Sequence, residues 1–156
     1  TLSLNTFVDL AQKLSVSTNA DGGYSVTASE DDELGKDGAT SPYIPDTDCD
    51  GEDCTISSDT EGNTASDNGF GYSLDNSVGT GSTAPSIAFE YDDGALNFSA
   101  RPFANIAASD SPVEVFAAGD VADTQNIYAC YRLSVGATQE AGDYENQVTY
   151  TATATF

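Results

Sequence analysis

Residues 46–54 (DTDCDGEDC) bring together the side chains of this sequence that are best suited to bind a metal ion. Asp46, Asp48 and Asp50 stand at alternate positions, and Gly51 comes directly after them. Hard cations such as Ca²⁺ take about six to eight oxygen ligands, and short loops supply them with alternating carboxylates and a glycine at the sharp turn. The spacing therefore predicts a Ca²⁺ site in this segment.

The residues after Gly51 restrict the type of metal loop. An EF-hand needs a glutamate at its twelfth position, which here is Ser57, and no helix pattern flanks the segment. We therefore predict a Ca²⁺ loop of another type, closed by Glu52, Asp53 or Asp59. A solvated acidic loop without an ion stays open as the alternative. Zinc is disfavoured because the chain has no His and its cysteines are badly spaced for a tetrahedral site.

Three cysteines, Cys49, Cys54 and Cys130, allow three possible disulfide pairings, among which sequence alone does not choose. We predict a Cys49–Cys54 bridge that pins the acidic loop, in hydrophilic and exposed surroundings. Cys130 would then be free or available for an intermolecular bond. Two cysteines this close together in a polar loop indicate an oxidising compartment.

The charge balance restricts the partners of the protein. Four basic residues stand against 26 acidic ones, giving a net charge of −22. Such a chain repels phosphate backbones and anionic lipids, so we expect no nucleic acid partner, whereas cations are attracted. No apolar run approaches the length of about 20 residues that spans a bilayer, and no membrane insertion is predicted. A start at Thr1 without Met is typical of a mature, secreted chain whose leader has been removed.

Catalysis is not expected from this composition. The chain has no His, which is the commonest general base, and a Ser or Cys nucleophile would lack its usual activator. Carboxylate pairs suited to glycoside hydrolysis are expected by chance in so acidic a chain. We therefore predict a protein that is not an enzyme.

The elements that must position these residues are strands, because apolar and polar residues alternate along most of the chain. We predict an all-β fold, a two-sheet β-sandwich of jelly-roll type, in a single domain over residues 1–156. The turn residues of NADGG (19–23) predict a hairpin between the strands at 13–18 and 24–29. Further strands are expected within 70–76, 86–91, 95–100, 113–118, 126–135 and 144–156.

Two segments depart from this regular pattern. Residues 30–69 form a long acidic insertion, in which 30–61 alone hold 12 of the 26 acidic residues, and loops of this length tend to be functional or ordered by metal. Residues 1–10 (TLSLNTFVDL) alternate from the first residue and place one set of side chains on a single face: Leu2, Leu4, Thr6, Val8 and Leu10. Such a strand can pair within its own sheet or add to the open sheet edge of a neighbour.

Three stretches resemble a recurring pattern of secreted prokaryotic surface proteins: LSVSTNADGGYSVTAS, GFGYSLDN and AGDYENQVTYTATATF. They are similar to the exported β-sandwich or jelly-roll subunits of extracellular fibres and tubes, such as camelysin-like biofilm fibre proteins and cannula-type tube proteins. The resemblance implies subunits joined by donor-strand complementation, with bound calcium in some families. It does not extend to the acidic insertion.

These observations predict a self-assembling structural subunit of an extracellular filament or tube. Copies of the chain would be its partners, residues 1–10 its donor strand and Ca²⁺ its stabilising ion. The alternative is a monomeric, calcium-dependent adhesin or carbohydrate-binding module that uses the acidic loop and Tyr43 to hold a ligand.

Overall fold

A computed structural model of the chain describes residues 2–51, 54–75, 85–88 and 98–156, and these residues form strands and no helix. The prediction of an all-β protein is therefore confirmed. The strands are β1 (Val8–Thr18), β2 (Tyr24–Glu30), β3 (Leu34–Lys36), β4 (Tyr43–Ile44), β5 (Thr60–Glu61), β6 (Gly69–Asp75), β7 (Ser86–Ile87), β8 (Ser99–Ala100), β9 (Val113–Ala118), β10 (Ala122–Ser134), β11 (Tyr144–Glu145) and β12 (Val148–Ala154).

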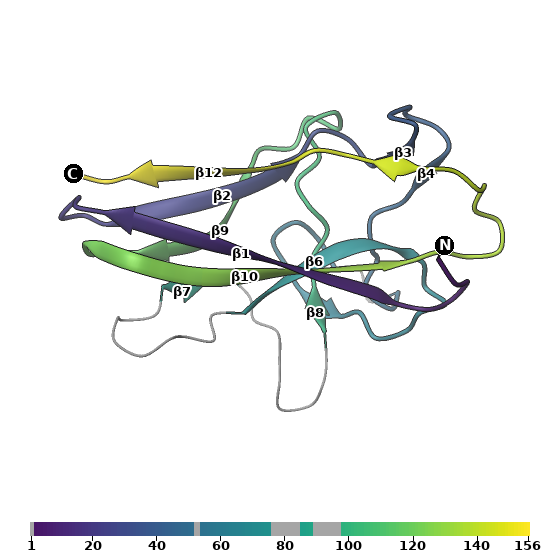
Figure 1. Cartoon of the computed structure of the whole chain (residues 1–156), viewed down its shortest axis with the longest axis horizontal. Coiled ribbons are helices and arrows are strands. Elements are labelled where there is room, and N and C mark those ends of the chain that lie inside the picture. Colours follow the sequence, from purple (N-terminus) through teal and green to yellow (C-terminus); the bar gives the residue numbers. More distant parts are fainter. Residues whose placement is uncertain (1, 52–53, 76–84, 89–97) are drawn as a thin grey trace.

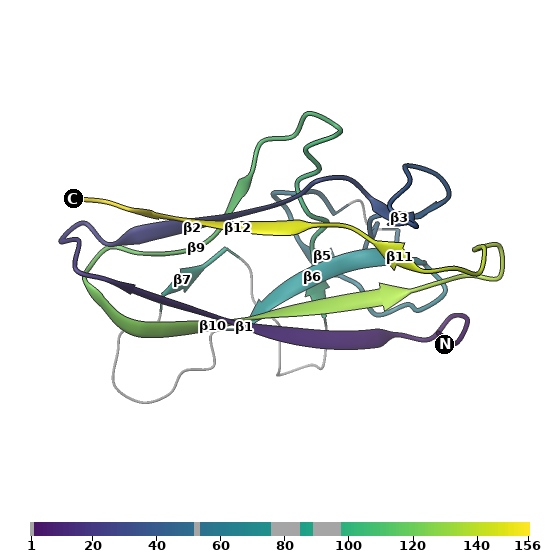
Figure 2. The same cartoon turned by 45° about the horizontal axis from the view of Figure 1, so that its top comes forward.

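The long strands form two antiparallel sheets that pack face to face. Sheet A has the order β1-β10-β6, and sheet B has the order β12-β2-β9-β7. Figures 1 and 2 show β12 and β2 along one layer and β1 and β10 along the other. The core between them takes side chains from both sheets, among them Tyr24, Val26, Tyr72, Leu74, Phe116 and Ile127. This is the predicted sandwich; its assignment to the jelly-roll type stays a prediction.

The turn at residues 19–23 is tight, as predicted, but the predicted hairpin is wrong. The Gly23 N–H donates to the Ala20 carbonyl at 3.0 Å, and Gly23 has a φ of 76° that favours glycine. β1 pairs along its length with β10, whereas β2 pairs with β12 and β9. The turn therefore carries the chain from sheet A to sheet B. Turn residues specify that the chain reverses its direction. The strand with which each flanking strand then pairs depends on which of its faces must be buried.

The first strand begins later than its alternation predicts. β1 runs without a break from Val8 to Thr18, while residues 2–7 lie outside any strand. Asn5 has a positive φ of 50°, which interrupts extended backbone, and its N–H donates to the Val135 carbonyl at 2.9 Å. Of the predicted donor-strand residues, Val8 and Leu10 thus belong to β1, and the others precede it.

Part of the acidic insertion packs against the outer face of sheet A, and its strands belong to two small sheets. β3 pairs with β4 and β11, and β5 pairs with β8. Beyond these strands, Cys49 packs with Phe98 and Ala100 in a small buried cluster that contacts Cys130 of β10. Cys130 alternates along β10 with Ala129 of the main core, so this cluster covers the outer face of sheet A.

Candidate functional site

The predicted Cys49–Cys54 disulfide is present, with its Cα atoms 5.7 Å apart. The prediction that the bridge lies in exposed surroundings is wrong for Cys49, which is fully buried against Phe98 and Ala100. The sequence around Cys49 is hydrophilic, and Cys49 is buried only because residues 98–100, distant in sequence, fold against it. The bridge therefore anchors the insertion to sheet A.

Cys130 is a free, half-buried thiol beside this bridge. Burial raises the pKa of its thiol, and the nearby carboxylates of Asp75 and Asp9 raise it further. A raised pKa lowers the fraction of thiolate, which is the nucleophilic form. The environment of Cys130 thus favours an unreactive thiol at neutral pH.

The acidic residues predicted to bind Ca²⁺ point to separate partners. The carboxylate of Asp50 accepts hydrogen bonds from the backbone N–H groups of Asn63 at 2.9 Å and Thr64 at 2.7 Å. Asp59 forms an ion pair with Arg101 at 3.2 Å. Asp48 is exposed. Two of these carboxylates therefore fasten the insertion in place.

The remaining predicted ligands do not complete a cage in the part of the chain that the structure describes. Asp46 contacts the side chain of Glu30, at the end of β2. Glu52 and Asp53 lie outside the described residues. Among the described residues, no three acidic or cysteine side chains are grouped to hold a metal ion. The Ca²⁺ loop stays a prediction.

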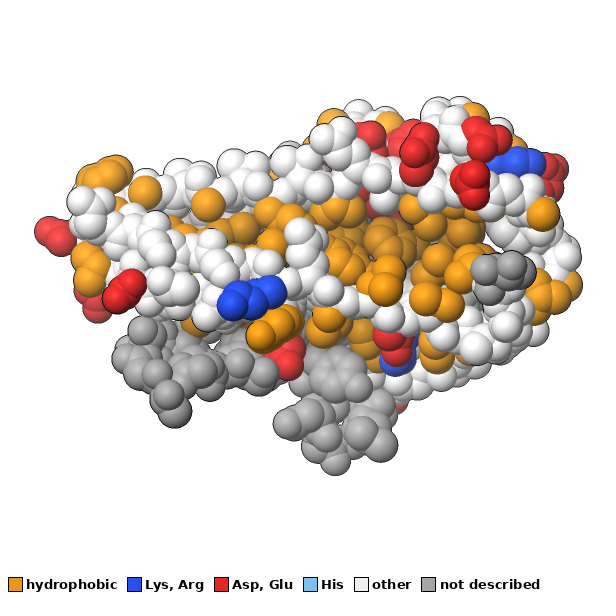
Figure 3. Space-filling view, in the orientation of Figure 1, with side chains coloured by type: hydrophobic (Ala, Val, Ile, Leu, Met, Phe, Trp, Pro, Cys, Tyr) orange, Lys and Arg blue, Asp and Glu red, His pale blue; other side chains and the backbone are white. Residues whose placement is uncertain are grey.

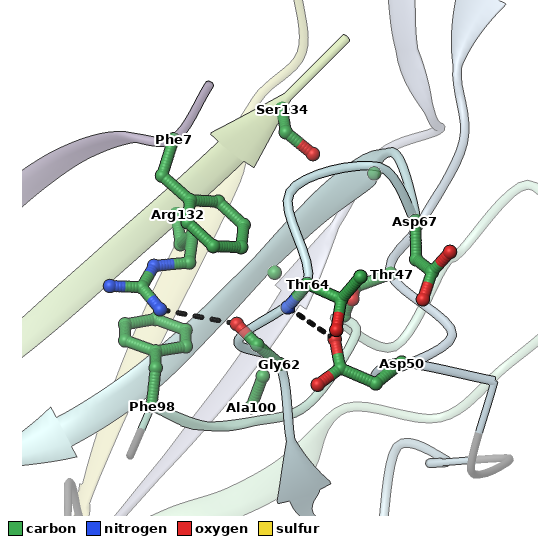
Figure 4. Close-up of a pocket in the computed structure, with 12 residues that line it drawn as sticks. Phe7, Thr47, Asp50, Gly62, Thr64, Asp67, Phe98, Ala100, Arg132 and Ser134 are labelled. Atoms are coloured by element: carbon green, nitrogen blue, oxygen red, sulfur yellow. Dashed lines mark hydrogen bonds between the residues drawn. The ribbon is translucent and has the colours of Figure 1, made fainter. Parts of the chain in front are cut away.

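An arginine clamp on the outer face of sheet A joins the N-terminal segment to the insertion (Figure 4). The Arg132 guanidinium lies between the rings of Phe7 and Phe98, 4.3 Å and 4.2 Å from their centroids. It donates to both carboxylate oxygens of Asp9, at 2.8 Å and 2.9 Å, and to the Gly62 carbonyl at 3.1 Å. Stacking and paired hydrogen bonds together suit the planar arginine fork. We call these five residues the Arg132 clamp.

The cavity beside the clamp is too small for a ligand. Its volume is about 10 Å³, and its lining includes Thr47, Asp50 and Ser134. A cavity of this size holds at most about one water molecule. The polar side chains drawn in Figure 4 therefore serve to hold the chain together rather than to bind a substrate.

A much larger groove opens on the side of the sandwich that Figure 3 shows, where apolar side chains fill a hollow. Its volume is about 660 Å³. One rim consists of residues 139–144. Its apolar lining, which defines what we call the apolar groove, comes from the N-terminal segment, from β3 and β4 and from the end of β10: Leu2, Leu4, Leu34, Ile44, Leu133 and Val135. A volume of this order suits a peptide segment or a small ligand.

The groove lies between the segment before β1 and the segment before β11, at one end of the side of the sandwich where β1 and β12 are edge strands. Each of these two strands has one hydrogen-bonded neighbour among the described strands. Inward side chains on this side are only partly buried, including Val16 of β1 and Val148 of β12. The hydroxyls of Tyr131 and Tyr150, from opposite sheets, lie 2.9 Å apart. Burial raises the pKa of both phenols, so both stay neutral, and the Tyr131 hydroxyl also donates to Gln12 Oε1 at 3.0 Å. One polar contact therefore links the sheets where apolar packing is incomplete.

The structure places the N-terminal residues of the predicted donor strand at this groove. Leu2 and Leu4 line it while remaining 41% and 56% exposed. Thr6 is exposed, and its hydroxyl donates to the Leu4 carbonyl at 3.1 Å. Leu10 is 69% exposed on β1 and does not line the groove. The sequence analysis missed Leu34 and Ile44, although both are apolar residues within an acidic stretch.

Comparison of the chain with protein-family models, with curated proteins and with solved structures gives no match. The described residues contain no helix of the length and apolar character needed to cross a membrane. Proposals about function therefore rest on the geometry above.

Proposed function

We propose that this chain is a structural subunit that assembles with copies of itself into an extracellular filament or tube by donor-strand complementation. The supporting observation is the apolar groove at one end of the side of the sandwich where β1 and β12 have a neighbour on one side only. A strand that enters such a groove gains main-chain hydrogen bonds along an edge, while its alternate side chains fill apolar sites.

The segment before β1 is the best candidate for the donor. Residues 2–7 lie outside any strand and place Leu2, Leu4 and Thr6 at alternate positions. When extended, residues 2–6 span about 17 Å. Burying each leucine side chain would contribute about 2 kcal/mol. Val8 and Leu10 stay paired with Leu133 and Tyr131 of the same chain, and Phe7 stays in the Arg132 clamp, which shortens the predicted donor to the residues before Phe7.

The redox environment that the disulfide indicates and the net charge of the chain are consistent with an extracellular, self-assembling subunit. The Cys49–Cys54 disulfide indicates a non-reducing environment, which is the condition outside the cell. Subunits that each carry a net charge of −22 repel one another, so assembly needs cations to screen or neutralise them. We expect assembly to require added salt or Ca²⁺.

The test is electron microscopy and light scattering of the purified chain with Ca²⁺ and with EDTA. Polymers should form from the wild type, and a variant carrying Leu2→Asp and Leu4→Asp should stay monomeric because charged side chains cannot enter the groove. Leu10→Asp is the matched control, since Leu10 is exposed outside the groove, and it should still polymerise. A wild type that is monomeric under every condition would contradict the filament and favour the monomeric binding module.

A second arm tests the acceptor. Leu34→Asp, at a partly exposed lining residue, places a carboxylate in the groove and leaves the donor segment unchanged. Mixed with wild-type subunits, this variant should cap growing polymers, because it can donate a strand but cannot accept one. Equal polymer lengths with and without the variant would show that the strand enters elsewhere.

A further inference from the structure

Two carboxyl groups meet inside the molecule where the sandwich joins the insertion. Glu30 is the last residue of β2 and is only 1% exposed, and its side chain is in hydrogen-bonding contact with that of Asp46, just after β4. The Asn146 side-chain N–H donates to Glu30 Oε2 at 2.7 Å. Glu30 Oε1 is buried without a hydrogen-bond donor. One oxygen of this buried carboxyl group therefore has no donor, and a second carboxyl group is in contact with the same side chain.

The backbone prevents Glu30 from relieving this contact by turning outward. Its N–H donates to the Ala104 carbonyl at 2.9 Å, and its carbonyl accepts from Ile106 at 3.0 Å. It also pairs with Val148 of β12. Burying a carboxylate without a compensating charge is costly. A charge that compensates the Glu30 carboxylate must therefore lie beside it in the folded protein.

The surroundings add negative charge. Burial, followed by the Asp46 carboxylate, raises the pKa of Glu30 to about 9, and Glu33 contributes in the same direction. Burial likewise raises the pKa of Asp46 to about 6, with Glu33 and Asp110 adding to it. Glu33 and Asp110 thus add to the negative field at the carboxyl pair, although neither joins it in a group of three ligand side chains among the described residues.

The basic side chains of the chain lie elsewhere. The structure pairs Lys36 with Glu140, Arg101 with Asp59 and Arg132 with Asp9. Lys13, the fourth basic residue, is exposed on β1. A compensating charge for the carboxyl pair must therefore come from solution, as a proton or as a metal ion.

We propose that Glu30 and Asp46 together bind a divalent cation of the Ca²⁺ type. A divalent cation compensates the charge of both carboxylates, whereas a shared proton would leave one negative charge on the pair in the field of two further acids, Glu33 and Asp110. Ca²⁺ completes its shell with carbonyl oxygens and water, so two protein carboxylates can anchor it. This site shares only Asp46 with the loop predicted from sequence. The ion would tie the end of β2 to the insertion.

The test is the melting temperature of metal-free protein titrated with Ca²⁺ at neutral pH. It is run in the Leu2→Asp, Leu4→Asp background, so that polymer formation cannot contribute and a failure of the assembly proposal is not confused with a failure of this one. Ca²⁺ at a hundredfold excess over its Kd should raise the melting temperature by about 5 to 10 °C. Glu30→Gln, which has nearly the same shape, should weaken Ca²⁺ binding at least about tenfold.

Asp48→Asn is the matched control, since Asp48 is an exposed carboxylate of the same acidic segment, and it should keep the full response to Ca²⁺. Terbium gives a second readout, because tyrosine excitation sensitises its emission and Tyr72 lies close enough to Glu30 for their charges to interact. Emission should fall in Glu30→Gln and in Asp46→Asn, which is the second variant if the first does not fold.

Three results would overturn the site. The first is an unchanged Ca²⁺ response in Glu30→Gln. The second is a response that Asp48→Asn abolishes and Glu30→Gln keeps, which would place the ion in the sequence-predicted loop. The third is no response to Ca²⁺ at all, together with stability in EDTA that falls as the pH rises from about 5 to about 8. Because acids with raised pKa values stabilise the fold only while protonated, that fall would identify a shared proton instead.

Discussion

Sheet A is closed on its outer face by the insertion, the disulfide and the Arg132 clamp, whereas the inner side between β1 and β12 is left open. On the closed face, polar side chains find specific partners: Arg132 contacts Asp9 and Gly62, and Asp50 accepts two backbone N–H groups. On the open side, a groove of about 660 Å³ exposes apolar side chains, and one tyrosine pair joins the sheets.

The closed face and the open side differ in how many specific polar interactions their side chains make. Polar residues of the insertion are used to secure a loop-rich layer that has little apolar surface of its own. On the open side, Leu2 and Leu4 remain exposed, and exposed apolar patches on soluble proteins commonly mark interaction sites. Variants should therefore affect the two regions differently: large losses of subunit stability on the closed face, and small ones on the open side.

The largest effect is expected for Arg132→Ala. This change removes the stacking with Phe7 and Phe98 and the hydrogen bonds to Asp9 and Gly62, so the free energy of unfolding should fall by about 3 kcal/mol, measured by denaturant titration. Lys36→Ala is the control, because Lys36 pairs with the well-exposed carboxylate of Glu140, and the melting temperature of this variant should not change measurably. Equal losses of stability in Arg132→Ala and Lys36→Ala would show that the Arg132 clamp stabilises the fold no more than a surface ion pair does.

A smaller loss is expected when the disulfide is removed. The Cys49→Ala, Cys54→Ala double variant frees a short loop, which should lower the free energy of unfolding by about 2 kcal/mol. Cys130→Ala removes a half-buried thiol without opening a loop, and its effect should be under about 1 kcal/mol. If the double variant were as stable as the single one, the bridge would not anchor the insertion. Thermal unfolding with and without reductant provides an independent measurement.

On the open side, Tyr150→Phe tests the contact that joins the sheets. The hydroxyl pair with Tyr131 is lost, while Tyr131 keeps its bond to Gln12, so the loss should be about 1 kcal/mol. Tyr43→Phe alters a well-exposed tyrosine and should change stability by less than about 0.5 kcal/mol. A loss of several kcal/mol for Tyr150→Phe would mean that the open side depends on this bond far more than its neighbours indicate.

The smallest effect on the subunit itself is expected at the donor segment. Leu2→Ser and Leu4→Ser should each change the free energy of unfolding by less than about 0.5 kcal/mol, because both side chains are exposed in the single subunit. Leu74→Ala, in the closed core, should cost about 2 to 5 kcal/mol. If Leu4→Ser were as destabilising as Leu74→Ala, the N-terminal segment would be part of the folded core and unsuited to donation.

The fold class could be predicted because alternation has a period of two and depends only on neighbouring residues. β10 shows this well, since its inward residues Ile127 and Ala129 were placed together by the pattern alone. Pairing could not be predicted: the turn at residues 19–23 is the same whether it closes a hairpin or crosses between sheets. The choice between them depends on β10, more than a hundred residues away in sequence.

Only part of the candidate site could be predicted, because sequence spacing indicates contacts between nearby residues and not between distant ones. Cys49 and Cys54 are close in sequence, so their pairing could be anticipated, and so could the alternation of Leu2 and Leu4. The carboxyl pair of Glu30 and Asp46 could not, because a run of acidic residues does not indicate which member will be buried. The apolar groove likewise combines residues from three distant segments.

The sequence by itself determined the all-β class and the excess of negative charge, because these depend on composition and short-range spacing, and the short separation of Cys49 and Cys54 favoured the disulfide that the structure shows. Only the tertiary structure decided that Asp50 would receive backbone N–H groups, that Glu30 would be buried against Asp46 and that one side of the sandwich would stay open. These outcomes depend on which distant segments share the limited interior, since each buried polar group must find its partner there.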